Sequence, residues 1–158
     1  MTRHLGFILL SVFVSLVLAL MPLPIAFEMY RPDLVLLVIM YWSIALPHRV
    51  NIGFAWMAGL IIDLALGSPL GVRSLTYSIV IYITASNYQK IRNFSVWQQA
   101  MLVALFLALY YLLVFWLNHF LLDIYFLPQY LWPVLTGALA WPWLFLLLRK
   151  YRRHFRIR

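Results

Sequence analysis

The segment Gly59-Leu-Ile-Ile-Asp63-Leu-Ala-Leu-Gly67-Ser-Pro-Leu-Gly71 places a single carboxylate inside an otherwise apolar stretch. An ionisable group at membrane depth is costly, and it persists where it has a partner, a cavity or a function. The rest of the chain indicates a membrane, because 66% of its 158 residues are hydrophobic, 10% are charged and the mean hydropathy is +0.93. Soluble domains average about 45–50% apolar and about 25% charged residues. We therefore expect an all-α integral membrane protein.

Charged residues and prolines divide the apolar residues into six runs, which predict six transmembrane helices in a single transmembrane domain over residues 1–158. The shorter runs have fewer than the roughly 20 residues that a helix needs to cross a bilayer. Their helices must therefore include flanking residues, thin the bilayer locally or be shielded from lipid by neighbouring helices. Prolines follow the first run where a cleavage site would stand, which favours a retained helix over a signal peptide. The runs are Leu5–Met21, Leu34–Leu46, Ile52–Leu66, Leu75–Tyr88, Gln99–Leu122 and Leu131–Leu148.

The basic residues predict the topology. If the N-terminus is cytoplasmic, only Arg31 and Arg73 of the 12 Lys and Arg residues fall in outer segments. This bias follows the positive-inside rule for an even number of crossings with both termini inside. The four acidic residues sort the opposite way, to outer segments or outer helix halves. The inner basic residues are Arg3, Arg49, Lys90, Arg92, Arg149, Lys150, Arg152, Arg153, Arg156 and Arg158, and the acids are Glu28, Asp33, Asp63 and Asp123.

Residues 149–158 form a basic cytoplasmic tail. Such a cluster holds the last helix in place and contacts anionic lipids, with each basic residue contributing about 1 kcal/mol near the membrane surface. The alternative is that the tail docks a cytoplasmic partner. Nucleic acid is not expected as a partner, because the net charge of +8 lies within reach of the bilayer.

Small residues and Asp63 recur at every fourth position of the third predicted helix, which makes one stripe of Ala55, Gly59, Asp63 and Gly67. The glycines suit close helix packing. Two interpretations of Asp63 stay open. It pairs with Arg73 or Arg31 on the same side, or it lines a pocket or partner surface.

The fourth predicted helix carries a polar stripe of Ser74, Ser78, Tyr82 and Ser86 at the same spacing. Hydrogen bonds between helices explain such a face without a ligand. If this face met the Asp63 stripe, the two helices would enclose a polar site open to the outside. The pair His119 and Asp123 is too small a set for a metal site, and no cofactor is expected. Without cysteine or paired carboxylates, the chain offers little for catalysis, and we do not expect an enzyme.

Four stretches closely resemble the MreD family of rod shape-determining proteins. They are Arg31-Pro-Asp-Leu-Val-Leu-Leu-Val-Ile-Met-Tyr-Trp-Ser-Ile-Ala-Leu-Pro-His-Arg-Val-Asn51, the segment from Gly59 to Arg73, Asn93-Phe-Ser-Val-Trp-Gln-Gln99, and Trp141-Pro-Trp143. The resemblance covers nearly the whole chain and keeps the order and spacing of its segments.

The resemblance implies a subunit of the bacterial cell-elongation complex in the cytoplasmic (inner) membrane. It implies an MreC-like bitopic membrane protein as partner, and through it the elongation transpeptidase, RodA and MreB. It also implies a fold similar to the substrate-binding subunits of energy-coupling-factor transporters, with an outward pocket beside the family's signature region. We expect a non-catalytic scaffold, and the alternative is a small-solute or lipid-intermediate binding subunit of a transporter. The candidate pocket or partner contacts are Gly59, Asp63, Gly67, Gly71, Arg73 and Arg31, beside the polar stripe.

Overall fold

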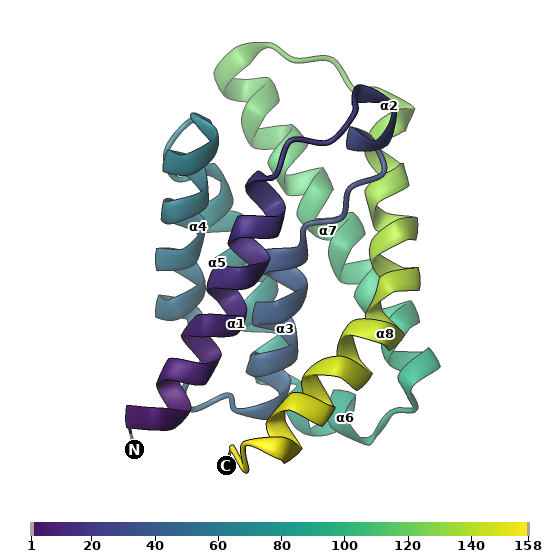
Figure 1. Ribbon diagram of the computed structural model, residues 1–158. Coiled ribbons are helices and arrows are strands. Elements are labelled where there is room, and N and C mark those ends of the chain that lie inside the picture. Colours follow the sequence, from purple (N-terminus) through teal and green to yellow (C-terminus); the bar gives the residue numbers. More distant parts are fainter. Residues whose placement is uncertain (1, 158) are drawn as a thin grey trace.

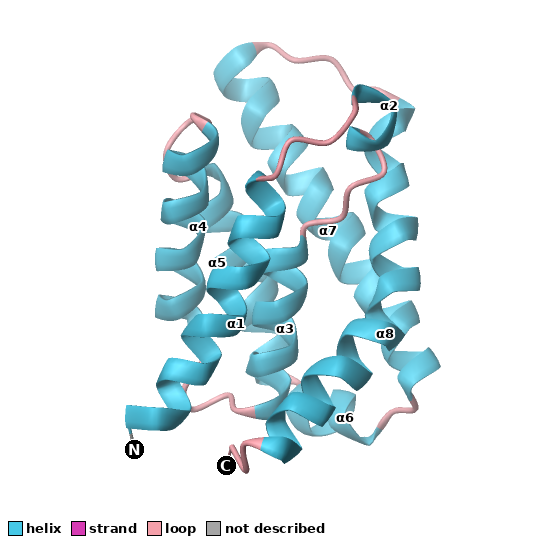
Figure 2. Ribbon diagram, in the orientation of Figure 1, coloured by secondary structure: helices cyan, strands magenta, loops and turns pink. Residues whose placement is uncertain are grey.

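The computed structural model describes residues 2–157, which are helical with no strand among them (Figures 1 and 2). Arg158 and the side chain of Arg3, which the topology argument used, lie outside the described part. The elements are α1 (Thr2–Leu20), α2 (Ile25–Glu28), α3 (Leu34–Ala45), α4 (Ile52–Leu66), α5 (Val72–Ser86), α6 (Tyr88–Asn93), α7 (Val96–Leu122), the 3-10 turn η1 (Pro128–Leu131) and α8 (Trp132–His154).

Each of the six predicted apolar runs is a helix, and most ends agree within a few residues. The largest difference is at α8, which continues through the basic tail to His154 because Lys and Arg are good helix formers. The short elements α2, α6 and η1 were not predicted, since pieces of this length carry no periodic pattern. By length and composition, Val96–Leu122 and Pro128–His154 could each cross a membrane, whereas α3 and α4 are shorter apolar helices.

The core of the bundle is α3, in which every residue from Val35 to Ile44 is buried. It packs against α1, α5, α6 and α8. A helix that is apolar on all sides is one that neighbours surround. With 12 residues and about 1.5 Å of rise per residue, α3 is only about 18 Å long. Its neighbours shield it, so its length need not match a bilayer.

The helices α4 and α5 are in close backbone contact at Gly59. A Cβ atom added there would collide with the backbone of Arg73 and Ser74 on α5. Only a residue without a side chain allows this approach, as expected for small residues between membrane helices. The packing role predicted for this glycine is confirmed.

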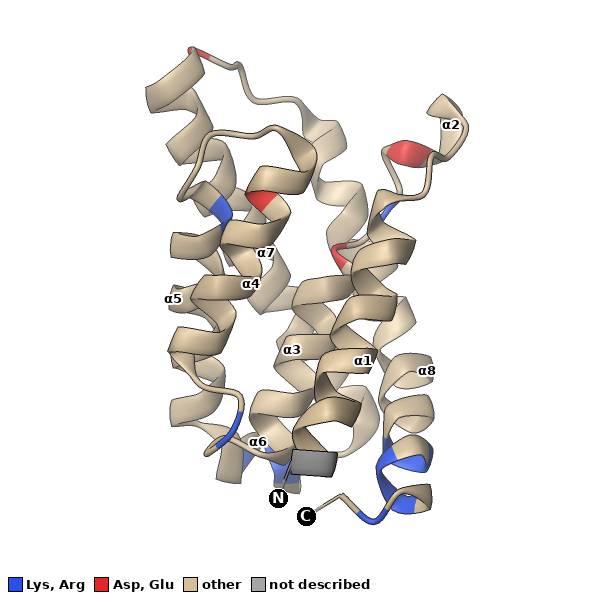
Figure 3. Ribbon diagram, turned by 60° about the vertical axis from the view of Figure 1, so that its left-hand side comes forward, with Lys and Arg blue, Asp and Glu red and all other residues tan. Residues whose placement is uncertain are grey.

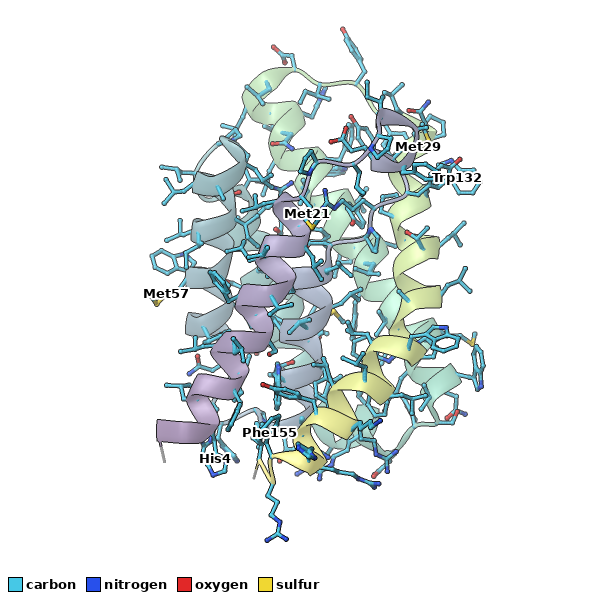
Figure 4. The ribbon with its side chains drawn as sticks, in the orientation of Figure 1. His4, Met21, Met29, Met57, Trp132 and Phe155 are labelled. Atoms are coloured by element: carbon cyan, nitrogen blue, oxygen red, sulfur yellow. The ribbon has the colours of Figure 1, made fainter. Side chains whose placement is uncertain are left out.

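The charged residues lie at opposite ends of the bundle. Figure 3 shows Lys and Arg gathered at the end that holds both termini, and Asp and Glu towards the other end, where two basic segments also lie. We call these the basic end and the acidic end. The side of the bundle between them is apolar: Leu64, Met101 and Leu139 are 67%, 76% and 70% exposed. The Met57 side chain likewise points away from the helices in Figure 4.

Candidate functional site

The Asp63 carboxylate organises the turn between α4 and α5. It is fully buried and accepts a hydrogen bond from the Ser68 hydroxyl at 2.8 Å. Its second oxygen accepts from the backbone N–H groups of Gly71 and Arg73, both at 3.1 Å. Gly67 and Gly71 have φ values of 64° and 100°, which favour glycine. The carboxylate therefore satisfies unpaired donors at the start of α5, where a negative charge is also favoured.

The predicted ion pair between Asp63 and Arg73 or Arg31 is replaced by these contacts. Arg73 meets the carboxylate through its backbone N–H, not through its guanidinium. The guanidinium of Arg31 donates to the carbonyl oxygens of Leu18 and Met21 at the end of α1, the latter at 2.8 Å. Because Asp63 is enclosed by its own chain, it can influence a partner only through the turn that it holds.

A second carboxylate, the half-buried Asp33, joins three helices at the acidic end. It precedes α3 as its N-cap and accepts from the Leu36 N–H at 3.1 Å. The Tyr77 hydroxyl on α5 lies 2.7 Å from both carboxylate oxygens, and the Tyr110 hydroxyl on α7 lies 2.7 Å from one of them. The Asp33 N–H donates to the Tyr111 hydroxyl at 3.1 Å. This cluster ties α3, α5 and α7 together.

The Arg73 side chain lines a cavity of about 170 Å³ beside this cluster. Its Nε and Nη1 atoms are buried without a hydrogen-bond partner. The nearby Asp33 carboxylate is already engaged by tyrosine hydroxyls and a backbone N–H. Buried donors without partners are costly, so an anionic or strongly polar group in this cavity would be stabilised. The cavity is lined by Ala19, Arg31, Pro32, Asp33, Val35, Ile62, Leu66, Arg73, Tyr110 and Tyr111.

An apolar groove between α1 and α4 adjoins this cavity. The groove has a volume of about 270 Å³ and shares Val35 and Ile62 with the lining of the cavity. Val35 on the buried helix α3 contributes to the lining between the two flanking helices, which stand side by side in Figure 1. Met57 and Ile61 of α4 also line it and are 61% and 51% exposed. A surface of this kind is suited to an apolar chain or helix.

The polar stripe of α5 does not enclose a separate site with α4. Ser74 is buried where the α5 backbone meets Gly59, so direct contact closes the space expected there. The Ser78 hydroxyl donates to the Ser74 carbonyl oxygen at 2.7 Å. Tyr82 lies on the outside of the bundle, 58% exposed.

His119 and Asp123 lie at the C-terminal end of α7, where both make local contacts. Asp123 is the C-cap residue, with φ of 50°. The Nδ1 atom of His119 lies 2.8 Å from the carbonyl oxygen of Ile124.

Sequence reasoning identified Arg73 and Arg31 but missed the importance of Asp33 and its tyrosines. The position of Asp33 directly before an apolar run is a signal for an N-cap. Nothing in the sequence indicates that Tyr77 and Tyr110 meet it, since they are 44 and 77 residues away.

An all-helical chain with an apolar exterior and charges sorted to opposite ends belongs to the class of helical membrane proteins. The family model for rod shape-determining protein MreD matches residues 2–151. The chain is 43% identical over 152 residues to the rod shape-determining protein MreD of Haemophilus influenzae, covering 96% of this chain and 94% of that protein. The chain therefore belongs to the MreD family.

This family acts in rod shape determination as part of the MreBCD system. No solved structure matches the chain. The likeness to transporter subunits thus stays a prediction.

Proposed function

We propose that this protein is a non-catalytic scaffold of the cell-elongation complex in the bacterial inner membrane. It binds the transmembrane segment of an MreC-like bitopic partner and supports lateral peptidoglycan synthesis. The protein associates with the elongation transpeptidase, RodA and MreB indirectly, through this partner. Family membership supports this role. The geometry of the acidic end bears on one part of this role, the binding of the partner.

In this proposal six helices of one domain cross the membrane with both termini in the cytoplasm. The basic end faces the cytoplasm, where residues 149–158 contact anionic lipids. The opposite locations of acidic and basic residues support this orientation, because positive charge is retained on the cytoplasmic side (Figure 3). The acidic end, with Asp33 and Arg73, then faces outward.

The observation that carries the partner proposal is that the α1–α4 groove adjoins the Arg73 cavity, with two lining residues in common. A single apolar helix lying in the groove would bring a group at its outer end to the Nε and Nη1 atoms of Arg73, which have no partner. A carboxylate or carbonyl oxygen of the partner would complete the hydrogen bonds that Arg73 lacks. Asp63, Gly67 and Gly71 contribute by building the turn that positions Arg73.

The proposal predicts that Arg73→Gln weakens partner binding. Loss of one member of a buried, hydrogen-bonded charge pair costs about 2 kcal/mol or more, which corresponds to about 30-fold in affinity. The measurement is co-purification of tagged protein with a full-length MreC-like partner in mild detergent. Lys150→Gln, which removes the same charge at the basic end, is the matched control and is expected to retain the partner. Equal recovery of partner with wild type and Arg73→Gln would refute this contact.

Cysteine crosslinking tests the groove independently, because the chain has no native cysteine. Ile61→Cys is expected to form disulfides with cysteines in the outer half of the partner's transmembrane segment, and Met57→Cys with cysteines about one helical turn further towards its inner end. Met101→Cys and Leu105→Cys lie on α7 and are 76% and 64% exposed, so they are controls of similar exposure. Crosslinks from the α7 positions alone would assign the partner to another face.

The second candidate function is binding of a small solute or lipid intermediate, as in a transporter subunit. The specific observation that favours it is the presence of Asp33, Arg73 and two tyrosines around the same small cavity. A small molecule that remains bound through purification in the absence of partner, and is lost in Arg73→Gln, would support it. Purification of the protein without its partner, from cells that express that partner, would count against the scaffold function.

A further inference from the structure

A larger cavity at the basic end takes no part in the partner binding proposed above. It measures about 380 Å³ and lies between α3, α7, α8 and the segment around α6. Its volume is within the range of small-molecule sites, about 300–1,000 Å³. Its polar lining comes from Tyr41, Arg92, Ser95, Gln99, Arg149 and Arg152, and its apolar lining includes Phe94 and Phe145.

The charge of this cavity selects an anion. Three guanidinium groups, from Arg92 on α6 and from Arg149 and Arg152 on α8, belong to its lining, which contains no acidic residue. Guanidinium groups bind phosphate through paired hydrogen bonds. Helix α7 begins at Val96, which also lines the cavity, and the first N–H groups of a helix favour negative charge.

Two uncharged side chains indicate that the cavity is built for a ligand and is not merely a cationic surface. Tyr41 is only 2% exposed, and its hydroxyl is buried without a hydrogen-bond partner. Gln99 is also 2% exposed; its amide nitrogen donates to the Ile91 carbonyl oxygen at 2.9 Å, whereas its Oε1 has no donor. Buried polar groups normally have partners. A phosphate oxygen would accept from Tyr41, and a hydroxyl of the same ligand would donate to Gln99.

The location of the cavity suits a lipid headgroup. Trp97 follows Val96 at the start of α7 and is 73% exposed, and Trp143 precedes the lining residue Phe145 and is 79% exposed. Exposed tryptophans on membrane helices gather at the level of the headgroups. A phosphate of the adjacent leaflet would therefore lie at the depth of the cavity.

We propose that this basic cavity binds a phosphate group, supplied by the headgroup of an anionic phospholipid or by a soluble phosphate compound. Arg92, Arg149 and Arg152 neutralise its charge, and Tyr41 donates a hydrogen bond to it. The inference rests on the proposed contact of residues 149–158 with anionic lipids and deepens it, and it holds with or without a protein partner.

Thermal stability and native mass spectrometry of the purified full-length protein test this inference. The probes are phosphatidylglycerol in mixed micelles, phosphatidylcholine as the reference without net charge, and inorganic phosphate in lipid-free detergent. Phosphatidylglycerol is expected to stabilise the wild type more than phosphatidylcholine and to remain bound. Stabilisation by phosphatidylglycerol alone identifies the lipid as the source, whereas equal stabilisation by inorganic phosphate identifies a soluble compound.

Variants locate the binding. Arg92→Gln with Arg149→Gln is expected to weaken binding about 25-fold, since each basic group near an anionic headgroup contributes roughly fivefold. Lys150→Gln with Arg153→Gln removes the same charge from tail residues outside the cavity lining and is expected to weaken retention of the bound lipid clearly less than the cavity pair does.

The decisive variant is Tyr41→Phe, which changes no charge and is expected to weaken binding about fivefold through the lost hydrogen bond. Wild-type binding by Tyr41→Phe, together with equal losses in the two double variants, would overturn the proposal. Absence of stabilisation by every phosphate probe would also overturn it. Arg73→Gln in the same preparations is expected to keep the phosphate ligand while losing the protein partner, so the two proposals can fail separately.

Discussion

The turn held by Asp63 makes a quantitative prediction about two substitutions at that position. The carboxylate accepts from the Ser68 hydroxyl and from the N–H groups of Gly71 and Arg73. In Asp63→Asn, the amide oxygen can accept from both N–H groups while the amide nitrogen donates to Ser68, whose hydroxyl can turn. Every hydrogen bond survives, but the charge is lost. Because charge-assisted hydrogen bonds are roughly twice as strong as neutral ones, the expected cost is about 1 kcal/mol.

The alanine variant removes the acceptor altogether. Asp63→Ala leaves two buried N–H groups without a partner, and each unsatisfied group costs about 1–3 kcal/mol. We expect a loss of about 2–4 kcal/mol of unfolding free energy, since the turn lies near the end of the bundle where water can reach part of it. For a chain of this size, each kcal/mol lowers the melting temperature by about 2–4 °C.

The assay is thermal unfolding in detergent followed by tryptophan fluorescence, with membrane insertion checked in parallel. The expected order of stability is wild type, then Asp63→Asn, then Asp63→Ala well below both. Asp123→Asn is the matched control, because this exposed residue caps α7 through its backbone, and its expected change is within about 0.5 kcal/mol. If the asparagine variant is as unstable as the alanine variant, the negative charge itself is the main contribution, and the hydrogen-bond account is wrong.

Two further predictions concern the packing and the second carboxylate. Gly59→Ala is expected to lower the unfolding free energy by about 1–3 kcal/mol, because its Cβ would collide with the α5 backbone. Gly6→Ala is the control in the same thermal assay. It has open space around it and is expected to be neutral or stabilising. Tyr77→Phe removes a hydrogen bond to Asp33 and is expected to lower the unfolding free energy by about 1.5–3 kcal/mol. Tyr82→Phe, at an exposed position, is the control and is expected to cause no measurable change. Equal melting temperatures for the two tyrosine variants would contradict a stabilising role of the cluster.

Most helices and the sorting of charge could be read from the sequence. Long apolar runs ended by prolines and charges predict helices because the backbone of an apolar segment must satisfy its own hydrogen bonds in a membrane. The run at 52–66 matches α4 at both ends. The importance of Gly59 was likewise readable, since a glycine at helical spacing beside other small residues indicates a close approach.

The partners of the polar groups were decided by the tertiary structure. Asp63 and Arg73 lie on the same side, as the sequence predicted, yet the carboxylate contacts the backbone of Arg73 because the turn brings N–H groups to it. This arrangement frees the guanidinium for the cavity. Sequence distance gives no such information, as a short loop can satisfy a carboxylate with either backbone or side-chain donors.

The sequence by itself determined the helical class, the approximate positions of the six main helices and the segregation of acids from bases. Each follows from the local chemistry of a segment, namely its hydrophobicity, its prolines and its charge. Only the tertiary structure decided that Asp33 meets Tyr77 and Tyr110, and that Tyr41 lines a cavity with arginines from α6 and α8. These groups come from separate helices, and their distances depend on how the helices pack around α3, which no single segment encodes.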